Sequence, residues 1–213
     1  MSDSGFRNIA VIGAGTMGSG IAAQIANAGH QVLLLDLAAQ DGAEKSPAEM
    51  AIDRLLASDP PQLMHKRNAG SIITGTISDD FDKLADCDWI IEAVVERLDI
   101  KKDLYARLHA TIGPDCIVSS NTSTIPISLL VEDMPVDFRK RFAITHYFNP
   151  ARYMRLLELV RGADGCRCWL RVQCVHGHLR SHLLAASRPS RRGGCRRLRC
   201  RHAADNRAHR GVD

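Results

Sequence analysis

The sequence of 213 residues lacks a long apolar run and a leader-like N-terminus. No stretch approaches the roughly 18 to 20 consecutive apolar residues that a membrane-spanning helix needs. Residues 1–7 hold no cationic segment followed by an apolar one, so we expect no secretory signal and a cytoplasmic location. Apolar residues make up 45% of the chain and charged residues 24%, which is typical of a soluble globular protein.

Lysine is absent from the last part of the chain. Residues 165–213 contain twelve arginines, no lysine and only two acidic residues. Residues 1–164 contain 16 lysines and arginines against 22 acidic residues. Cysteine divides the same way, because only Cys87 and Cys116 of the seven cysteines precede residue 165. The positive net charge therefore comes from the end of the chain, and the two parts need separate interpretations.

Closely spaced glycines follow the first apolar run. Residues 8–12 read Asn-Ile-Ala-Val-Ile, and residues 13–18 read Gly-Ala-Gly-Thr-Met-Gly before a small and apolar stretch that ends at Gly29. This order predicts a strand, a tight turn and a helix that a glycine terminates. Residues 31–36, Gln-Val-Leu-Leu-Leu-Asp, predict a buried parallel strand with Asp36 at its carboxyl end. Together these segments form a βαβ unit of about 30 residues.

The spacing of these residues suits a dinucleotide. Gly13 permits the tight turn, Gly15 lets the backbone approach a pyrophosphate, and Gly18 lets the helix pack on the strand. The helix N-terminus presents N–H groups and a positive dipole end to phosphates. Asp36 is placed to accept hydrogen bonds from ribose hydroxyls and would repel a 2′-phosphate, so NAD is favoured over NADP. The alternative is a glycine turn used only for packing.

Further segments alternate between predicted helices and strands. Residues 46–57 predict a helix with a capping box at Ser46, and residues 62–69 predict a second amphipathic helix. A strand over 72–77, a short helix over 79–84 and a helix that reaches about His109 are also expected. Apolar runs predict four more strands, over residues 88–95, 117–123, 142–150 and 154–160. The predicted fold is a Rossmann-type, doubly wound parallel α/β sheet that lacks its last strand or strands.

Polar residues stand at the ends of these predicted strands. Ligands of open parallel sheets bind beyond the carboxyl ends of the strands. Glu96, Ser123, His146 and Asn149 lie at or just after such ends, and Lys101 heads the next helix. Each could also be a turn former or a helix cap, but their shared position around one cofactor crevice favours a binding site.

Four motifs give the chain a family resemblance. Gly-Ala-Gly-Thr-Met-Gly, Glu-Ala-Val-Val-Glu, Ser-Asn-Thr-Ser and His-Tyr-Phe-Asn-Pro occur in this order. Over residues 5–163 the chain thereby resembles the NAD-binding domain of 3-hydroxyacyl-CoA dehydrogenases. The resemblance implies NAD-dependent, reversible oxidation of a (3S)-3-hydroxyacyl-CoA to a 3-oxoacyl-CoA, in fatty acid β-oxidation or a related acyl-CoA pathway.

The resemblance also implies roles for matching residues. His146 corresponds to the general base, and Glu158 to the carboxylate that pairs with it. A carboxylate partner fixes the tautomer of an imidazole and stabilises the imidazolium, which agrees with these roles. Ser123 corresponds to a hydroxyl that contacts substrate and cofactor. Matching cofactor-side positions are Glu96, Lys101 and Asn149, with Met17 in the pyrophosphate turn. The predicted helices between Ser46 and Ala69 occupy the place of an insertion that contacts coenzyme A.

The resemblance ends near Gly162. We therefore expect an NAD-binding domain over residues 1–163 and an Arg/Cys-rich, unstructured tail over 164–213 that trypsin cuts first. The family's helical second domain, which carries its homodimer contacts, is expected to be absent, so that the chain is a truncated enzyme. A shifted reading frame explains arginine without lysine best. A zinc site lacks the usual Cys-x-x-Cys pairs, and a nucleic-acid arm lacks aromatic interleaving.

Three functions follow from these observations. The first is the dehydrogenase, with an acyl-CoA substrate and activity impaired by the truncation. The second is an NAD-binding module without catalysis, which the missing second domain favours. The third is nucleic-acid binding through the arginine tail, which is the weakest of the three. We expect no metal site and no membrane association.

Overall fold

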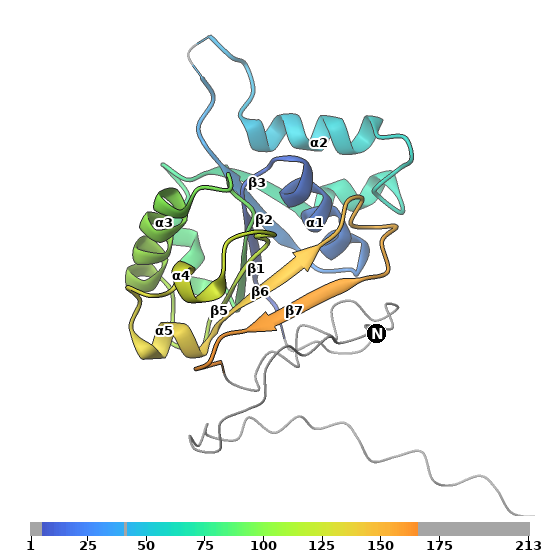
Figure 1. Cartoon of the computed structure of the whole chain (residues 1–213). Coiled ribbons are helices and arrows are strands. Elements are labelled where there is room, and N and C mark those ends of the chain that lie inside the picture. Colours follow the sequence, from blue (N-terminus) through green and yellow to red (C-terminus); the bar gives the residue numbers. More distant parts are fainter. Residues whose placement is uncertain (1–5, 41, 166–213) are drawn as a thin grey trace, which may run out of the picture.

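The computed structural model describes residues 6–40 and 42–165 of the chain (Figure 1). A seven-stranded sheet lies between helices on its two faces. The strands are β1 (Ile9–Ile12), β2 (Val32–Asp36), β3 (Ile72–Thr76), β4 (Trp89–Glu92), β5 (Ile117–Ser120), β6 (Phe142–Tyr147) and β7 (Leu157–Arg161). The helices are α1 (Thr16–Asn27), α2 (Pro47–Ala57), α3 (Leu98–Thr111), α4 (Ile127–Leu130) and α5 (Val136–Lys140), with short 3₁₀ helices η1 (Lys66–Ser71) and η2 (Phe81–Asp86).

The order of the strands fixes where a ligand site can form. The order is β3-β2-β1-β4-β5-β6-β7, and the first six strands run parallel. From β1 the chain builds outwards to β3, then crosses back to place β4 on the other side of β1. Such a reversal opens a crevice at the carboxyl ends of the two central strands, and the glycine turn after β1 lies at this point.

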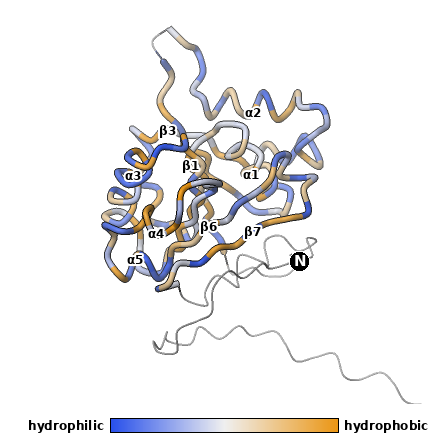
Figure 2. Tube along the Cα trace, viewed as in Figure 1, coloured by the Kyte–Doolittle hydropathy of each residue, from blue (hydrophilic) through white to orange (hydrophobic). Residues whose placement is uncertain are grey.

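Two apolar layers hold the sheet. Every residue of β1 and β4 is buried, as expected for parallel strands that helices cover on both faces. One core cluster joins the sheet to α1 and α2, and the other joins it to η2, α3, α4 and α5. Figure 2 shows apolar residues along the strands, whereas hydrophilic and apolar residues alternate along α2 and α3. The small residues of α1 let this helix lie close to the sheet.

The predicted fold class is confirmed, with local differences. The last strand, β7, runs antiparallel to β6, whereas a parallel strand was expected. A parallel crossover needs about a dozen residues or more, and the connection over residues 148–156 is shorter than that. The strand also begins at Leu157 rather than Met154, and a 3₁₀ helix over Lys66–Ser71 stands where a helix over 62–69 was predicted.

Some predictions concern parts of the chain that the structure does not describe. The unstructured tail, its trypsin sensitivity, and the zinc and nucleic-acid alternatives fall on residues 166–213 or depend on them, outside the described residues. The expectation of an incomplete sheet also concerns this part of the chain. Within residues 6–40 and 42–165, no helix has the length and apolar character required to cross a bilayer.

Candidate active site

The glycine turn between β1 and α1 is built by packing as well as by conformation. Gly13 has a φ of +101°, and a Cβ there would lie 2.5 Å from the Ala93 carbonyl oxygen. A Cβ on Gly18 would lie 1.8 Å from the carbonyl oxygen of Gly13. Gly15 differs, because a Cβ on it would meet no atom within 4 Å. The outer glycines therefore close the turn, while the backbone at Gly15 stays open to a ligand.

The N-terminus of α1 is suited to an anion. Its N-cap residue is Gly15, no side chain caps the helix, and its first turn contains no acidic residue. The first N–H groups of a helix have no partner within the helix and carry a partial positive charge. Met17 in this turn is half-buried and packs against the core cluster beneath α1. These features fit a pyrophosphate, as the sequence predicts.

Asp36 joins the end of β2 to the glycine turn. One oxygen of its carboxylate accepts a hydrogen bond of 2.5 Å from the Ala14 N–H, and the other accepts one of 2.7 Å from the Leu37 N–H. On the other side of Ala14, the Arg54 guanidinium of α2 donates a hydrogen bond of 2.8 Å to the Ala14 carbonyl. The sequence alone does not indicate a role for Arg54, because the helical pattern of α2 gives no sign of which side chain reaches the turn.

Glu96 anchors the segment that follows β5. Its Oε1 accepts hydrogen bonds from the Thr122 hydroxyl, from the Thr124 hydroxyl at 3.1 Å, and from the N–H groups of Ser123 and Thr124, both at 3.3 Å. Lys101 lies 3.2 Å from the other oxygen. Burial raises the pKa of Glu96, but the Thr122 hydrogen bond and the Lys101 charge outweigh it and lower the pKa to about 2. The stability that the ionised Glu96 contributes is therefore fully present above about pH 4.5 and is lost as the pH falls towards 2.

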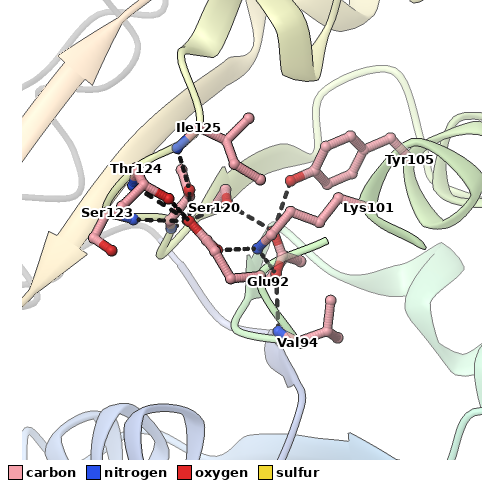
Figure 3. Close-up of polar contacts among 10 residues, drawn as sticks. Glu92, Val94, Lys101, Tyr105, Ser120, Ser123, Thr124 and Ile125 are labelled. Carbon is pink, nitrogen blue, oxygen red and sulfur yellow. Dashed lines mark hydrogen bonds and ion pairs between the residues drawn. The ribbon is translucent and has the colours of Figure 1, made fainter. Parts of the chain in front are cut away.

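A buried polar cluster underlies Glu96 (Figure 3). Glu92, the last residue of β4, has no exposed surface, and Lys101 of α3 is 1% exposed. The Glu92 carboxylate accepts hydrogen bonds of 2.6 Å from Lys101, from the Tyr105 hydroxyl and from the Ser120 hydroxyl, and one of 2.8 Å from the Val94 N–H. A buried charge is tolerated only when it is paired and fully hydrogen-bonded, and Glu92 meets both conditions.

This cluster was not found from the sequence. The only signal was an acidic residue inside the apolar run Trp-Ile-Ile-Glu-Ala-Val-Val. Its side-chain donors come from α3 and β5, and no spacing rule relates these residues to Glu92. Lys101 was predicted as a cofactor contact; it lies beneath Glu96 and bridges the two carboxylates.

His146 and Glu158 face each other across the antiparallel pair β6 and β7. They are partners in the register of the two strands, and Nδ1 of His146 lies 2.8 Å from Oε2 of Glu158. The His146 side chain is 21% exposed, and the Phe148 ring packs beside its imidazole with centroids 4.5 Å apart. With the Nδ1 proton directed at Glu158, the lone pair of the imidazole is on Nε2, the position that a general base requires.

Two further residues stand at the edges of this site. Ser123 and Asn149 are both exposed, and Asn149 lies just beyond the end of β6. Asn121, which the sequence did not single out, joins the loop after β5 to the end of β6, because its side-chain oxygen accepts a hydrogen bond of 2.8 Å from the Tyr147 N–H. The segment after β5 is therefore held next to His146.

Comparison with known proteins gives consistent matches. Residues 8–167 match the family model described as the NAD-binding domain of 3-hydroxyacyl-CoA dehydrogenase. Over 155 residues the chain is 43% identical to a probable 3-hydroxyacyl-CoA dehydrogenase of Deinococcus radiodurans, covering 72% of this chain and 45% of the relative. It is equally identical, over 155 residues, to a putative fatty acid oxidation complex trifunctional enzyme of Rickettsia felis, covering 72% of this chain and 22% of that protein.

Solved structures agree with these matches. The crystal structure of 3-hydroxybutyryl-CoA dehydrogenase from Escherichia coli K12 superimposes with a TM-score of 0.67 at 34% identity, covering 81% of this chain and 37% of that one. The same enzyme from Ralstonia eutropha gives a TM-score of 0.67 at 29% identity, with 84% and 63% covered. The chain spans less than half the length of the Deinococcus radiodurans and Rickettsia felis relatives.

Proposed function

The chain belongs to the 3-hydroxyacyl-CoA dehydrogenase family through its NAD-binding domain, and from this premise we propose that it oxidises a (3S)-3-hydroxyacyl-CoA to the 3-oxoacyl-CoA with NAD. The observation that carries the proposal is the contact between His146 and Glu158, on the same sheet as the glycine turn. The pathway we propose is fatty acid β-oxidation or a related acyl-CoA pathway.

The geometry supports a proton-transfer role for His146. A bound NAD would supply the acceptor for the hydride from carbon 3 of the substrate. The lone pair on Nε2 of His146 would accept the proton of the 3-hydroxyl group. Glu158 accepts a hydrogen bond from the Nδ1–H group and would stabilise the imidazolium that forms. In the reverse direction, the imidazolium returns its proton to the oxygen of the reduced carbonyl.

The cofactor-side residues fit NAD by their surroundings. The open backbone at Gly15 and the uncapped N-terminus of α1 suit the pyrophosphate. The Asp36 carboxylate at the end of β2 suits the adenosine ribose hydroxyls. We propose that the cofactor-binding residues are Gly13, Gly15, Met17, Gly18, Asp36, Glu96, Lys101, Ser123 and Asn149, with the buried Lys101 acting through its contact with Glu96. Ser123 is proposed to contact the substrate as well.

The extent of the functional unit is part of the proposal. We propose that residues 1–163 are the NAD-binding domain and that residues 164–213 contribute no catalytic group. The acyl-CoA substrate is carried over from the resemblance, and we propose a cytoplasmic location, as expected from the sequence.

A module that binds NAD without catalysis is the second candidate, since the chain matches the NAD-binding part of its longer relatives. Oxidation of NADH that depends on acetoacetyl-CoA separates the two functions. The enzyme proposal requires NADH consumption that rises with acetoacetyl-CoA concentration. Binding of NADH without consumption at any acetoacetyl-CoA concentration would support the module and contradict the enzyme.

Cofactor choice gives a direct test of Asp36. We expect NAD to bind at least about 100-fold more tightly than NADP, because a carboxylate facing a phosphate costs several kcal/mol. Isothermal titration calorimetry with both cofactors measures this ratio. Asp36→Asn should lower the ratio of NAD affinity to NADP affinity. Glu132→Gln, which removes a surface carboxylate paired with Lys102, should leave this ratio unchanged. Equal affinities of the wild-type chain for NAD and NADP would contradict the role of Asp36.

A further inference from the structure

The buried carboxylate of Glu92 has no capacity to bind a ligand itself. Its Oε1 accepts from Lys101 and the Val94 N–H, and its Oε2 accepts from the hydroxyls of Tyr105 and Ser120. A carboxylate offers about four acceptor positions, so these donors fill all of them. Any influence of Glu92 on the active site must therefore pass through its neighbours.

One such neighbour leads directly to the site. The Lys101 ammonium lies 2.6 Å from Glu92 and 3.2 Å from Glu96, and so bridges the two carboxylates. Glu96 in turn accepts hydrogen bonds from the backbone N–H groups of Ser123 and Thr124. A continuous series of contacts thus runs from the end of β4, through α3, to the segment that carries Ser123.

The direction of the Ser123 side chain makes this series relevant to function. Figure 3 shows the Ser123 backbone facing the cluster, while its hydroxyl group points away from it. Glu96 also holds the hydroxyl groups of Thr122 and Thr124, so it fixes the segment on both sides of Ser123. The position of the Ser123 hydroxyl therefore depends on where the Glu96 carboxylate lies.

We propose that Glu92 is a positioning residue, which fixes the Lys101 ammonium and thereby sets the position of Glu96 and of the Ser123 hydroxyl. A buried ammonium needs a charged partner, and Glu92, which has no exposed surface, lies closer to Lys101 than Glu96, whose side chain is 37% exposed. The effect of Glu92 on cofactor binding rests on the proposed function, in which the Ser123 segment contacts NAD. The effect of Glu92 on the position of the Ser123 segment does not depend on the proposed function.

Two variants of the full chain separate positioning from stability. Glu92→Gln keeps the shape of the side chain but removes the charge opposite Lys101. Tyr105→Phe is the matched control, because it removes one buried hydrogen bond to Oε2 and leaves the contact between Oε1 and Lys101 in place. For each variant, the amide resonances of Ser123 and Thr124 are measured by NMR, NADH affinity by fluorescence and stability by urea unfolding.

We expect Glu92→Gln to move the Ser123 and Thr124 amide resonances and to weaken NADH binding by about tenfold or more, the worth of one hydrogen bond to a charged group. Tyr105→Phe should leave the amide resonances and the NADH affinity unchanged while lowering the midpoint of urea unfolding. Unmoved Ser123 and Thr124 resonances in Glu92→Gln, or equal movement in both variants, would overturn the inference.

Two further outcomes have definite meanings. If Glu92→Gln does not fold, Glu92→Asp, which keeps the charge but retracts it by one methylene group, is compared with Tyr105→Phe by the same resonances and criteria. A wild-type chain that does not bind NADH contradicts the proposed function, whereas the amide resonances still decide whether Glu92 positions the Ser123 segment.

Discussion

Replacing His146 by alanine is expected to lower the rate at which NADH reduces acetoacetyl-CoA by about 10²- to 10⁴-fold, the usual contribution of a general acid or base. The imidazole is the group that carries the proton between the 3-oxygen and the protein. Glu158→Gln should also slow the reaction, because the amide neither fixes the tautomer nor stabilises the imidazolium as a carboxylate does. Steady-state kinetics at saturating NADH measures both effects.

The controls for this prediction use binding and a second histidine. NADH affinity should change little in His146→Ala and Glu158→Gln, since neither side chain is assigned to the cofactor. His65→Ala, at an exposed position before η1, should keep the wild-type rate. An unchanged rate in His146→Ala would remove this histidine from the mechanism, and an equal loss in His65→Ala would point to a general effect on folding.

Replacing Lys101 by methionine is expected to lower the free energy of unfolding by about 3 to 5 kcal/mol, the cost of leaving a buried charge without its partner. Glu92 has no exposed surface and would keep only its neutral donors. Urea unfolding measures the loss. Lys45→Met is the matched control, because Lys45 pairs with Asp53 at the surface, where solvent screens such a pair and its contribution to stability is small.

A double variant gives this prediction a second test. In Lys101→Met with Glu92→Gln, the uncompensated buried charge is absent, so a large part of the lost stability should return. Equal losses in Lys101→Met and Lys45→Met would contradict a structural role for the buried pair. A double variant no more stable than Lys101→Met alone would show that the loss has another cause than the stranded charge.

Local patterns allowed the first half of the sheet to be predicted from the sequence. The strand, glycine turn and helix around Gly13 and Gly18 follow each other along the chain, so their spacing carries the information. Asp36 is also fixed locally, by its place at the end of an apolar run. The prediction failed where tertiary contacts decide, as in the antiparallel pairing of β7 and the donors that surround Glu92.

The antiparallel pairing of β6 and β7 makes the match between His146 and Glu158 a matter of strand register. The residues on either side of Glu158 are Leu157 and Leu159, which pair with Tyr147 and Thr145. A shift of β7 by one residue in either direction would place one of these leucines opposite His146. It would also turn Glu158 to the other face of the sheet, because successive side chains point to opposite faces. The connecting loop can therefore change in length only if this alignment is kept. A single-residue deletion within β7 that shifts the register would separate His146 from Glu158 without replacing either residue.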